Sequence, residues 1–349
     1  MMFASDNASG AHPAVMAALA RANDGPAMPY GNDPATARVE ALIREIFEAP
    51  RARVLLMSTG TGANALALAG LCPPWGAIYC HDIAHIEVDE CNAPEFYTGG
   101  AKLSHVDGAQ AMIDADALSD RLAGSGRGVV HNAQPGALSI TQATERGAIY
   151  TPGDVANLAA IARRHGLPVQ MDGTRFANAV AATGASPTAL SHGAGVDILC
   201  LGATKCGTLA AEAVIVFEPE ARPDLVWQLE LRRKRAGHLY SKMRFVAAQM
   251  EAWLDGGLWL DLATHANSMA ARLRAGLARA GIEVVSPPGA NLTFARLPSG
   301  LHRALQDAGA AYYADPVPGD CVEARFVTSW ATSEAEVDAL LAACIANAA

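Results

Sequence analysis

Two charged residues follow apolar, strand-like runs of the sequence: Asp172 comes directly after 168–171, and Lys205 comes after 197–201 and the short stretch Gly202-Ala203-Thr204. A lysine in an apolar setting has a lowered pKa, and its neutral amine is the form that attacks a carbonyl to make a Schiff base. Pyridoxal phosphate is held by such a lysine, with an aspartate or arginine beside its pyridinium nitrogen. The two motifs together therefore predict a pyridoxal phosphate site, although either one alone also fits an ordinary turn or surface loop.

A third feature is the small-residue turn Thr59-Gly60-Thr61-Gly62, between an apolar run and a segment rich in alanine and leucine. It predicts a strand, a turn and a helix start, where unpaired amides and the helix dipole bind phosphate. Gly60 and Thr61 are the candidate phosphate donors, whereas Asn64 either takes part or only stabilises the turn. The turn matches neither a Walker loop nor a dinucleotide fingerprint, and a plain strand-turn-helix connection stays open.

The elements that must position these residues alternate between strand and helix from residue 53 onward. This is typical of a mostly parallel sheet covered by helices on both faces. Ligands bind beyond the carboxyl ends of such strands, where Thr59, Asp172 and Lys205 all fall. Helices are also expected at 13–22, 35–48 and 223–254, and the strands expected in this sheet are 53–57, 77–80, 102–105, 128–131, 168–171, 197–201 and 213–217.

Two glycines, Gly256 and Gly257, mark a break in the pattern. We therefore expect a large domain at 1–250 that includes an N-terminal arm, and a small C-terminal α/β domain at 251–349. The elements expected in the small domain are strands at 282–285, 291–297 and 322–328 and helices at 259–280, 300–308 and 333–347.

Nearly the whole chain resembles the threonine aldolases of the β-eliminating lyase family, which are fold-type I pyridoxal phosphate enzymes. The low-specificity L-threonine aldolase subgroup, which also cleaves phenylserine-type substrates, is the most similar. The resemblance implies retro-aldol cleavage of L-threonine, L-allo-threonine and related β-hydroxy-α-amino acids to glycine and an aldehyde. Transamination, β-elimination or racemisation of an amino acid stays open, because these reactions share the same cofactor anchors. The matching stretches are Phe3–Asn7, Tyr30–Asp33, Thr59–Asn64, Ala84–Ile86, Met171–Arg175, Thr204-Lys205 and Arg325–Trp330.

The resemblance also implies roles around the cofactor. Lys205 forms the Schiff base, and Thr204 offers its hydroxyl to the phosphate. Asp172 keeps the pyridinium nitrogen protonated, so that the ring accepts electrons from the substrate. His85 stacks on the ring, and Arg175 contacts the phenolic oxygen of the cofactor or the substrate carboxylate.

A second group of residues is expected to bind the amino-acid substrate. Arg325 has the guanidinium fork that suits an α-carboxylate, and Ser5 of the N-terminal arm completes this clamp. Relatives donate the loop that contains Tyr30 across a subunit interface, and the basic run 232–235 lies in a neighbourhood that approaches the partner's site. The resemblance therefore implies a homo-oligomer, a dimer of dimers.

The base for the β-hydroxyl proton is the least determined residue. His131 ends the expected strand 128–131 and is the candidate, while Asp89, four residues after His85, is expected to orient that imidazole. Many relatives carry a second histidine in a Glu-Asn-Thr-His motif, but the corresponding stretch here, 142–147, contains none. The sequence therefore leaves the base open between His131 and the His85–Asp89 pair.

Composition limits the remaining partners. A net charge of −9 argues against nucleic acid and anionic membranes, and neither a signal-like N-terminus nor an apolar window of ~18 residues is present. The seven cysteines form no Cys-x-x-Cys pair, which indicates free thiols in the cytoplasm. No metal is predicted.

Overall fold

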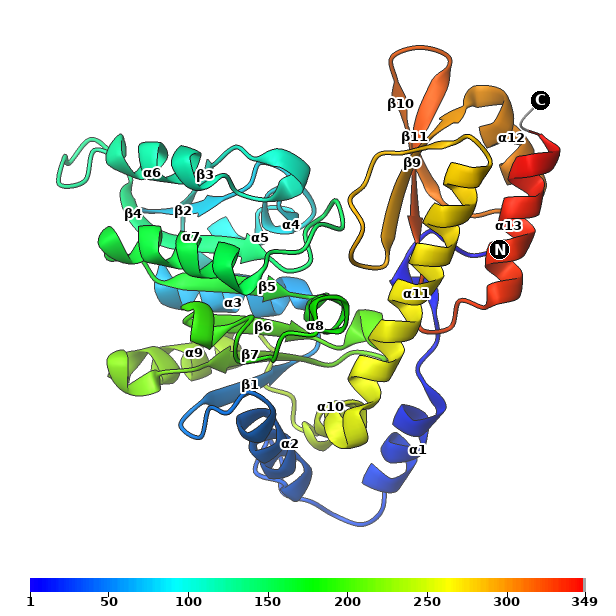
Figure 1. Ribbon diagram of the computed structural model, residues 1–349. Helices are drawn as coiled ribbons and strands as arrows, with labels where there is room; N and C mark the ends of the chain where they lie inside the picture. The colour runs from blue at the N-terminus through cyan, green and yellow to red at the C-terminus, as the bar shows by residue number, and fades with distance from the viewer. Residues whose placement is uncertain (348–349) are drawn as a thin grey trace.

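The computed structural model describes residues 1–347, and its larger part is built around a seven-stranded sheet (Figure 1). The strand order is β1-β7-β6-β5-β4-β2-β3, with β7 antiparallel to both of its neighbours and the pairs from β3 to β6 parallel. The expected mostly parallel sheet is confirmed. Its strands are β1 (Arg53–Met57), β2 (Gly76–Cys80), β3 (Lys102–His105), β4 (Gln134–Thr141), β5 (Val169–Gly173), β6 (Ile198–Gly202) and β7 (Glu212–Val216).

Helices cover both faces of this sheet (Figure 1). Alternate side chains of β1 show the two faces: Val54 and Leu56 belong to one hydrophobic core, Leu55 and Met57 to another. The first core is covered by α2 (Pro34–Ile46), α6 (Ala115–Ala123), α7 (Pro152–Arg164), α8 (Phe176–Thr183) and α10 (Arg244–Leu254), and the second by α3 (Gly60–Leu71) and α9 (Pro223–Arg235). The remaining helices here are α1 (Pro13–Ala22), α4 (His85–Val88) and α5 (Ala93–Thr98).

Two expected elements of the large domain are wrong. The segment 128–131 is an exposed turn, because Gly126 and Gly128 take positive φ angles of 66° and 80° that no strand continues through. The Gln134 side chain accepts the Gly128 amide at 2.8 Å, and β4 begins only there. The helix expected over 223–254 is divided into α9 and α10 by a loop in which Gly237 has φ 80°.

The small domain has a four-stranded sheet of order β10-β11-β9-β8, in which all pairs are antiparallel. Leu297, Leu305 and Phe326 lie in its own core, which also takes in Phe3 of the N-terminal arm. The strand β10 was not expected from the sequence. The elements are β8 (Glu283–Val284), β9 (Leu292–Pro298), α12 (Ser299–Asp307), β10 (Tyr313–Val317), β11 (Cys321–Val327) and α13 (Glu334–Ala346).

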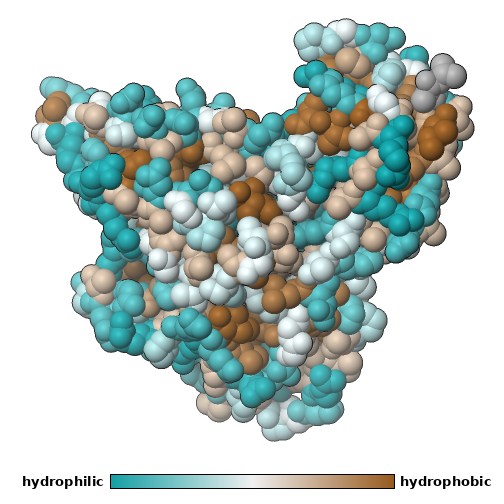
Figure 2. Space-filling model, in the orientation of Figure 1, coloured by the Kyte–Doolittle hydropathy of each residue, from teal (hydrophilic) through white to brown (hydrophobic). Residues whose placement is uncertain are grey.

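One long helix, α11 (Leu258–Arg279), joins the two parts (Figure 1). Its Trp259 packs in the core of the large sheet, and its Leu273 packs in the core of the small domain. Figure 2 shows the surface hollowed between these two parts. The division at residues 250 and 251 remains a prediction, since both cores share α11. Within residues 1–347, no helix is long and apolar enough to cross a membrane.

Candidate active site

Lys205 lies in a short turn, η4 (Thr204–Cys206), directly after β6. Burial lowers the pKa of its amine, and the nearby Arg175 guanidinium lowers it further. The carboxylates of Asp6, Asp172 and Glu212 act against this effect. The structure thus places a lysine with a lowered pKa at the carboxyl edge of the sheet, and a lowered pKa favours the neutral amine that Schiff-base chemistry requires.

Asp172 ends the buried strand β5, and hydrogen bonds fix both of its oxygens. Its Oδ1 accepts from the amide and hydroxyl of Thr174 at 2.9 and 2.6 Å, and its Oδ2 accepts from the Asn64 side chain at 2.8 Å. The other end of Asn64 accepts from Gln170 at 3.0 Å. A carboxylate held this way can serve as the fixed partner of a pyridinium nitrogen.

His85 begins α4 and contacts a different acid from the one expected. Its Nδ1 lies 2.8 Å from Oε1 of Glu90, and that same oxygen accepts from Asn64 at 3.0 Å. Helix α4 ends after Val88, so Asp89 is an exposed cap residue and not the partner of the imidazole. The Glu90 hydrogen bond raises the pKa of His85, although burial opposes it.

The phosphate turn has the predicted form. Thr59 caps α3 by accepting the Gly62 amide at 3.1 Å, while the amides of Gly60 and Thr61 have no acceptor among residues 1–347. A side chain at Gly62 would place its Cβ 2.7 Å from the ring of His238. Glycine at this position leaves room for the His238 ring, and the helix start can receive an anion.

Thr204 differs from its expected role. Its hydroxyl donates to the carboxylate of Glu212 and accepts from the Ala211 amide at 3.2 Å. The donor proton is used within the turn here, and a contact of this hydroxyl with the phosphate remains a prediction. Glu212 was not predicted from the sequence, although a lone carboxylate within the apolar run 210–216 was a signal for it.

Arg175 and Arg325 lie near each other beside the N-terminal arm. Arg175 uses Nε and Nη2 to donate to Asp6 at 2.8 and 3.1 Å. Burial alone would raise the pKa of Asp6, but the charges of Arg175 and Lys205 hold it below its ordinary value. Arg325, on β11, donates to the carbonyl of Ala4 at 3.4 Å. The pKa of Arg325 is lowered by burial and then by Arg175.

The other three predicted residues are His131, Tyr30 and Ser5. His131 is exposed in the turn before β4, at the amino end of that strand. Eight residues rising ~3.3 Å each put this turn roughly 25 Å from the carboxyl edge, so the structure does not bring His131 to the site. Tyr30 is 45% exposed, and its ring faces the Lys234 ammonium at 4.7 Å. Ser5 caps the short turn η1 (Asp6–Ala8) by accepting the Asn7 amide at 3.1 Å.

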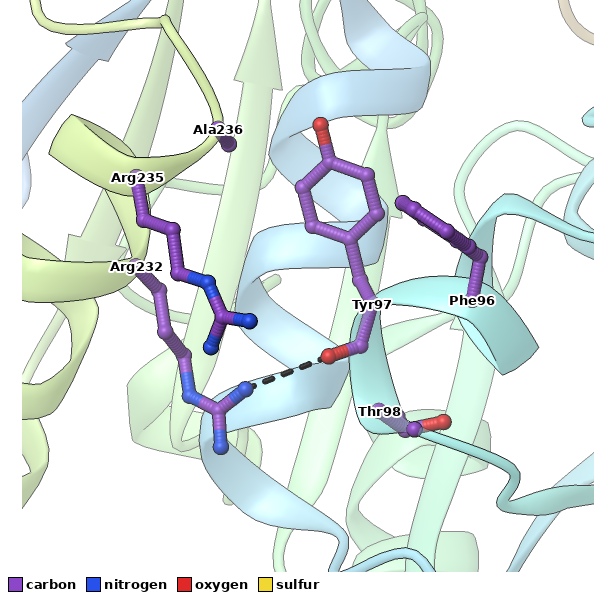
Figure 3. A pocket seen from close by; sticks show the side chains of 7 residues that line it. Phe96, Tyr97, Thr98, Arg232, Arg235 and Ala236 are labelled. Carbon is purple, nitrogen blue, oxygen red and sulfur yellow. Dashed lines mark hydrogen bonds between the residues drawn. The ribbon is translucent and has the colours of Figure 1, made fainter.

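A cavity of about 630 Å³ lies between α5 and α9 (Figure 3). It is lined by Phe96, Tyr97, Arg232 and Arg235, among others, and Arg232 donates to the Tyr97 carbonyl at 3.1 Å. None of the predicted site residues lines it. This cavity is therefore not the reaction centre.

The donor set at the sheet edge fits pyridoxal phosphate. A buried lysine amine with a lowered pKa can bond its aldehyde, a buried carboxylate can face its ring nitrogen, and open helix amides can receive its phosphate. His85, Glu90 and Asp172 also bring ligand atoms within 4.8 Å of one another, but Asn64 already bridges the two acids by hydrogen bonds. The fold and this site define a fold-type I enzyme that uses pyridoxal phosphate.

Comparisons with known proteins identify the family of the chain. Residues 2–298 match the beta-eliminating lyase family, and the chain belongs to that family. It is 38% identical over 341 residues to a low specificity L-threonine aldolase of Pseudomonas sp. (strain NCIMB 10558), covering 97% of this chain and 96% of that protein. A second such enzyme, from Pseudomonas aeruginosa, is 40% identical over 332 residues, covering 95% and 93%.

Solved structures agree with this assignment. A threonine aldolase from Leishmania major superposes with a TM-score of 0.92 at 28% identity, covering 100% of this chain and 99% of that one. A serine palmitoyltransferase from Sphingomonas wittichii reaches 0.72 at 15% identity, covering 99% and 86%. At that identity the second match supports the fold alone.

Proposed function

We propose that the protein is a pyridoxal phosphate-dependent aldolase that cleaves L-threonine and L-allo-threonine to glycine and acetaldehyde. Related β-hydroxy-α-amino acids, including phenylserine, are further proposed substrates. The observation that carries the proposal is one cluster at the sheet edge, in which a hydrogen-bonded imidazole, His85, adjoins the fixed carboxylate of Asp172 and the electropositive pair Arg175 and Arg325. The relatives named as threonine aldolases support the same reaction.

In this proposal, His85 removes the β-hydroxyl proton. Glu90 accepts from Nδ1, so the neutral ring keeps its lone pair on Nε2. The His85 side chain is 34% exposed, whereas that of Glu90 is fully buried, so the imidazole can reach a substrate and its partner cannot. Pyridoxal phosphate, when bound, supplies the electron sink for the broken Cα–Cβ bond.

The substrate carboxylate is proposed to bind between Arg325 and Arg175. Asp6 engages Nε and Nη2 of Arg175, which leaves Nη1 for a further acceptor. Arg325 reaches the same region from the small domain, next to Ser5 of the N-terminal arm. Fixing the carboxylate selects which Cα bond faces the electron sink, and this is the basis of the proposed reaction specificity.

The test combines spectroscopy with product analysis. Purified protein should show a visible absorption band from bound cofactor, and Lys205→Ala should lose it on dialysis, whereas Lys102→Ala, at an exposed lysine on β3, should keep it. Asp172→Asn should retain cofactor but lose most turnover. Glycine and aldehyde should appear together from threonine and from phenylserine. Release of pyruvate or of a keto acid instead would overturn the aldolase assignment.

We also propose a homo-oligomer, a dimer of dimers, in which Tyr30 approaches the partner's site. The apolar Trp227 and Leu231, one turn apart on α9, are 65% and 51% exposed, and large exposed apolar groups near a basic run support a protein contact. All seven cysteines are free thiols, which supports a cytoplasmic location. Light scattering that shows an active monomer would contradict the oligomer.

A further inference from the structure

Glu212 is a buried carboxylate beside the proposed Schiff-base lysine. It opens the antiparallel strand β7, opposite Gly202 at the end of β6, and only 4% of its surface is exposed. A Cβ at Gly202 would lie 2.9 Å from Oε2 of Glu212 and 2.7 Å from the Cα of Thr174. The end of β6 therefore has no room for a side chain at residue 202 next to this carboxylate.

The Glu212 carboxylate is hydrogen-bonded to the turn that contains Lys205. It accepts from the hydroxyl of Thr204. The same hydroxyl accepts from Ala211, which ties the turn to the start of β7. These two hydrogen bonds of the Thr204 hydroxyl restrict the backbone immediately before the lysine.

The charges of Glu212 and Lys205 also act on each other. Burial raises the pKa of Glu212 to about 7, with Thr204 and Lys205 lowering it and Asp172 raising it. In return, the Glu212 carboxylate raises the pKa of Lys205, against burial. The other groups that face this pair are Asp6 from η1, His85 from α4, Asp172 from β5, Arg175 before α8 and the Cys200 thiol from β6.

We propose that Glu212 is a positioning residue for Lys205, which fixes the turn through Thr204 and sets the pH at which the lysine nitrogen loses its charge. The inference rests on the proposed role of Lys205. Replacing Glu212 should therefore change the pH at which the lysine nitrogen titrates, in addition to any change in the rate of turnover.

The experiment titrates the visible band of the holoenzyme with pH. Glu212→Gln keeps the size and an acceptor for Thr204 but removes the negative charge, so the band should titrate at lower pH than in the wild type. Thr204→Val removes a hydrogen bond that lowers the pKa of Glu212, so more of the carboxylate is protonated at neutral pH. This variant should shift the titration in the same direction by a smaller amount, while Thr204→Ser should match the wild type.

The outcomes separate this inference from the proposed function. If Lys205→Ala abolishes the band but Glu212→Gln and Thr204→Val both titrate as the wild type does, the role of Glu212 is overturned and that of Lys205 stands. If Lys205→Ala keeps the titrating band, the lysine assignment itself fails. Should Glu212→Gln not retain cofactor, the shift in Thr204→Val and its absence in Thr204→Ser decide the question.

Discussion

Removing the Asn64 side chain should show most directly how strongly the buried acids of the site depend on their hydrogen-bond donors. Its two amide protons go to two different buried acids, Oδ2 of Asp172 at 2.8 Å and Oε1 of Glu90 at 3.0 Å. Its oxygen accepts from Gln170 at 3.0 Å, and only 1% of the residue is exposed. Asn64→Ala leaves two neighbouring carboxylates without the donor between them.

The expected cost follows from these contacts. A hydrogen bond to a charged group contributes about 1.5–3 kcal/mol and a neutral one about 1 kcal/mol. Losing two of the first kind and one of the second gives roughly 4–7 kcal/mol. Water entering the vacated space would replace part of the lost donors, so we expect a decrease of about 4 kcal/mol in the free energy of unfolding.

The assay is denaturant unfolding of the apoprotein, with Asn178→Ala as the matched control. Asn178 is also buried, at 4% exposure, but its side chain donates to the neutral Asn267 amide at 3.0 Å. Losing that single neutral hydrogen bond should cost about 1 kcal/mol. If the two variants lose the same free energy within ~1 kcal/mol, the acids do not depend on Asn64 and the reasoning is wrong.

Three further predictions concern the reaction. Glu90→Gln should let the pKa of His85 fall, because the Glu90 hydrogen bond is what raises it. The acidic limb of the pH profile of kcat/KM should then move to lower pH, while the cofactor content stays unchanged. An acidic limb that does not move would argue against His85 as the base. His131→Ala should cleave threonine within about twofold of the wild-type rate, whereas His85→Ala should lose roughly 10²-fold or more; a comparable loss in His131→Ala would restore that residue. Arg325→Lys should raise KM for threonine about tenfold, the effect of ~1.4 kcal/mol, since lysine lacks the two-pronged contact; a loss confined to kcat would point away from carboxylate binding.

The fold was largely predictable because its signals are local. Strands β5, β6 and β7 are buried along their whole length, as continuous apolar runs predict for a covered sheet. The errors arose where apolar content and backbone geometry disagree. Val129 and Val130 lie in an exposed turn, and β10 was missed because this edge strand is mostly exposed and contains Asp315 and Pro316.

The site was only partly predictable for a different reason. Asp172 and Lys205 follow apolar runs, so the sequence marks them locally. Glu90 and Asp6 carry no such mark, because their partners Asn64 and Arg175 lie 26 and 169 residues away. Only the folded sheet brings these acids to one edge, and composition cannot distinguish them from solvated carboxylates.

In the stretch 142–147, where relatives carry a second histidine, this chain has a buried carboxyl group. Glu145 lies there, and its Oε1 accepts the backbone amide of His85 at 2.8 Å. Burial raises the pKa of this carboxyl, and its other oxygen is buried without a hydrogen-bond partner among residues 1–347. An atom so enclosed can hold the start of α4 in place but cannot reach a substrate hydroxyl. This arrangement supports His85, whose backbone amide Glu145 holds, as the proposed base.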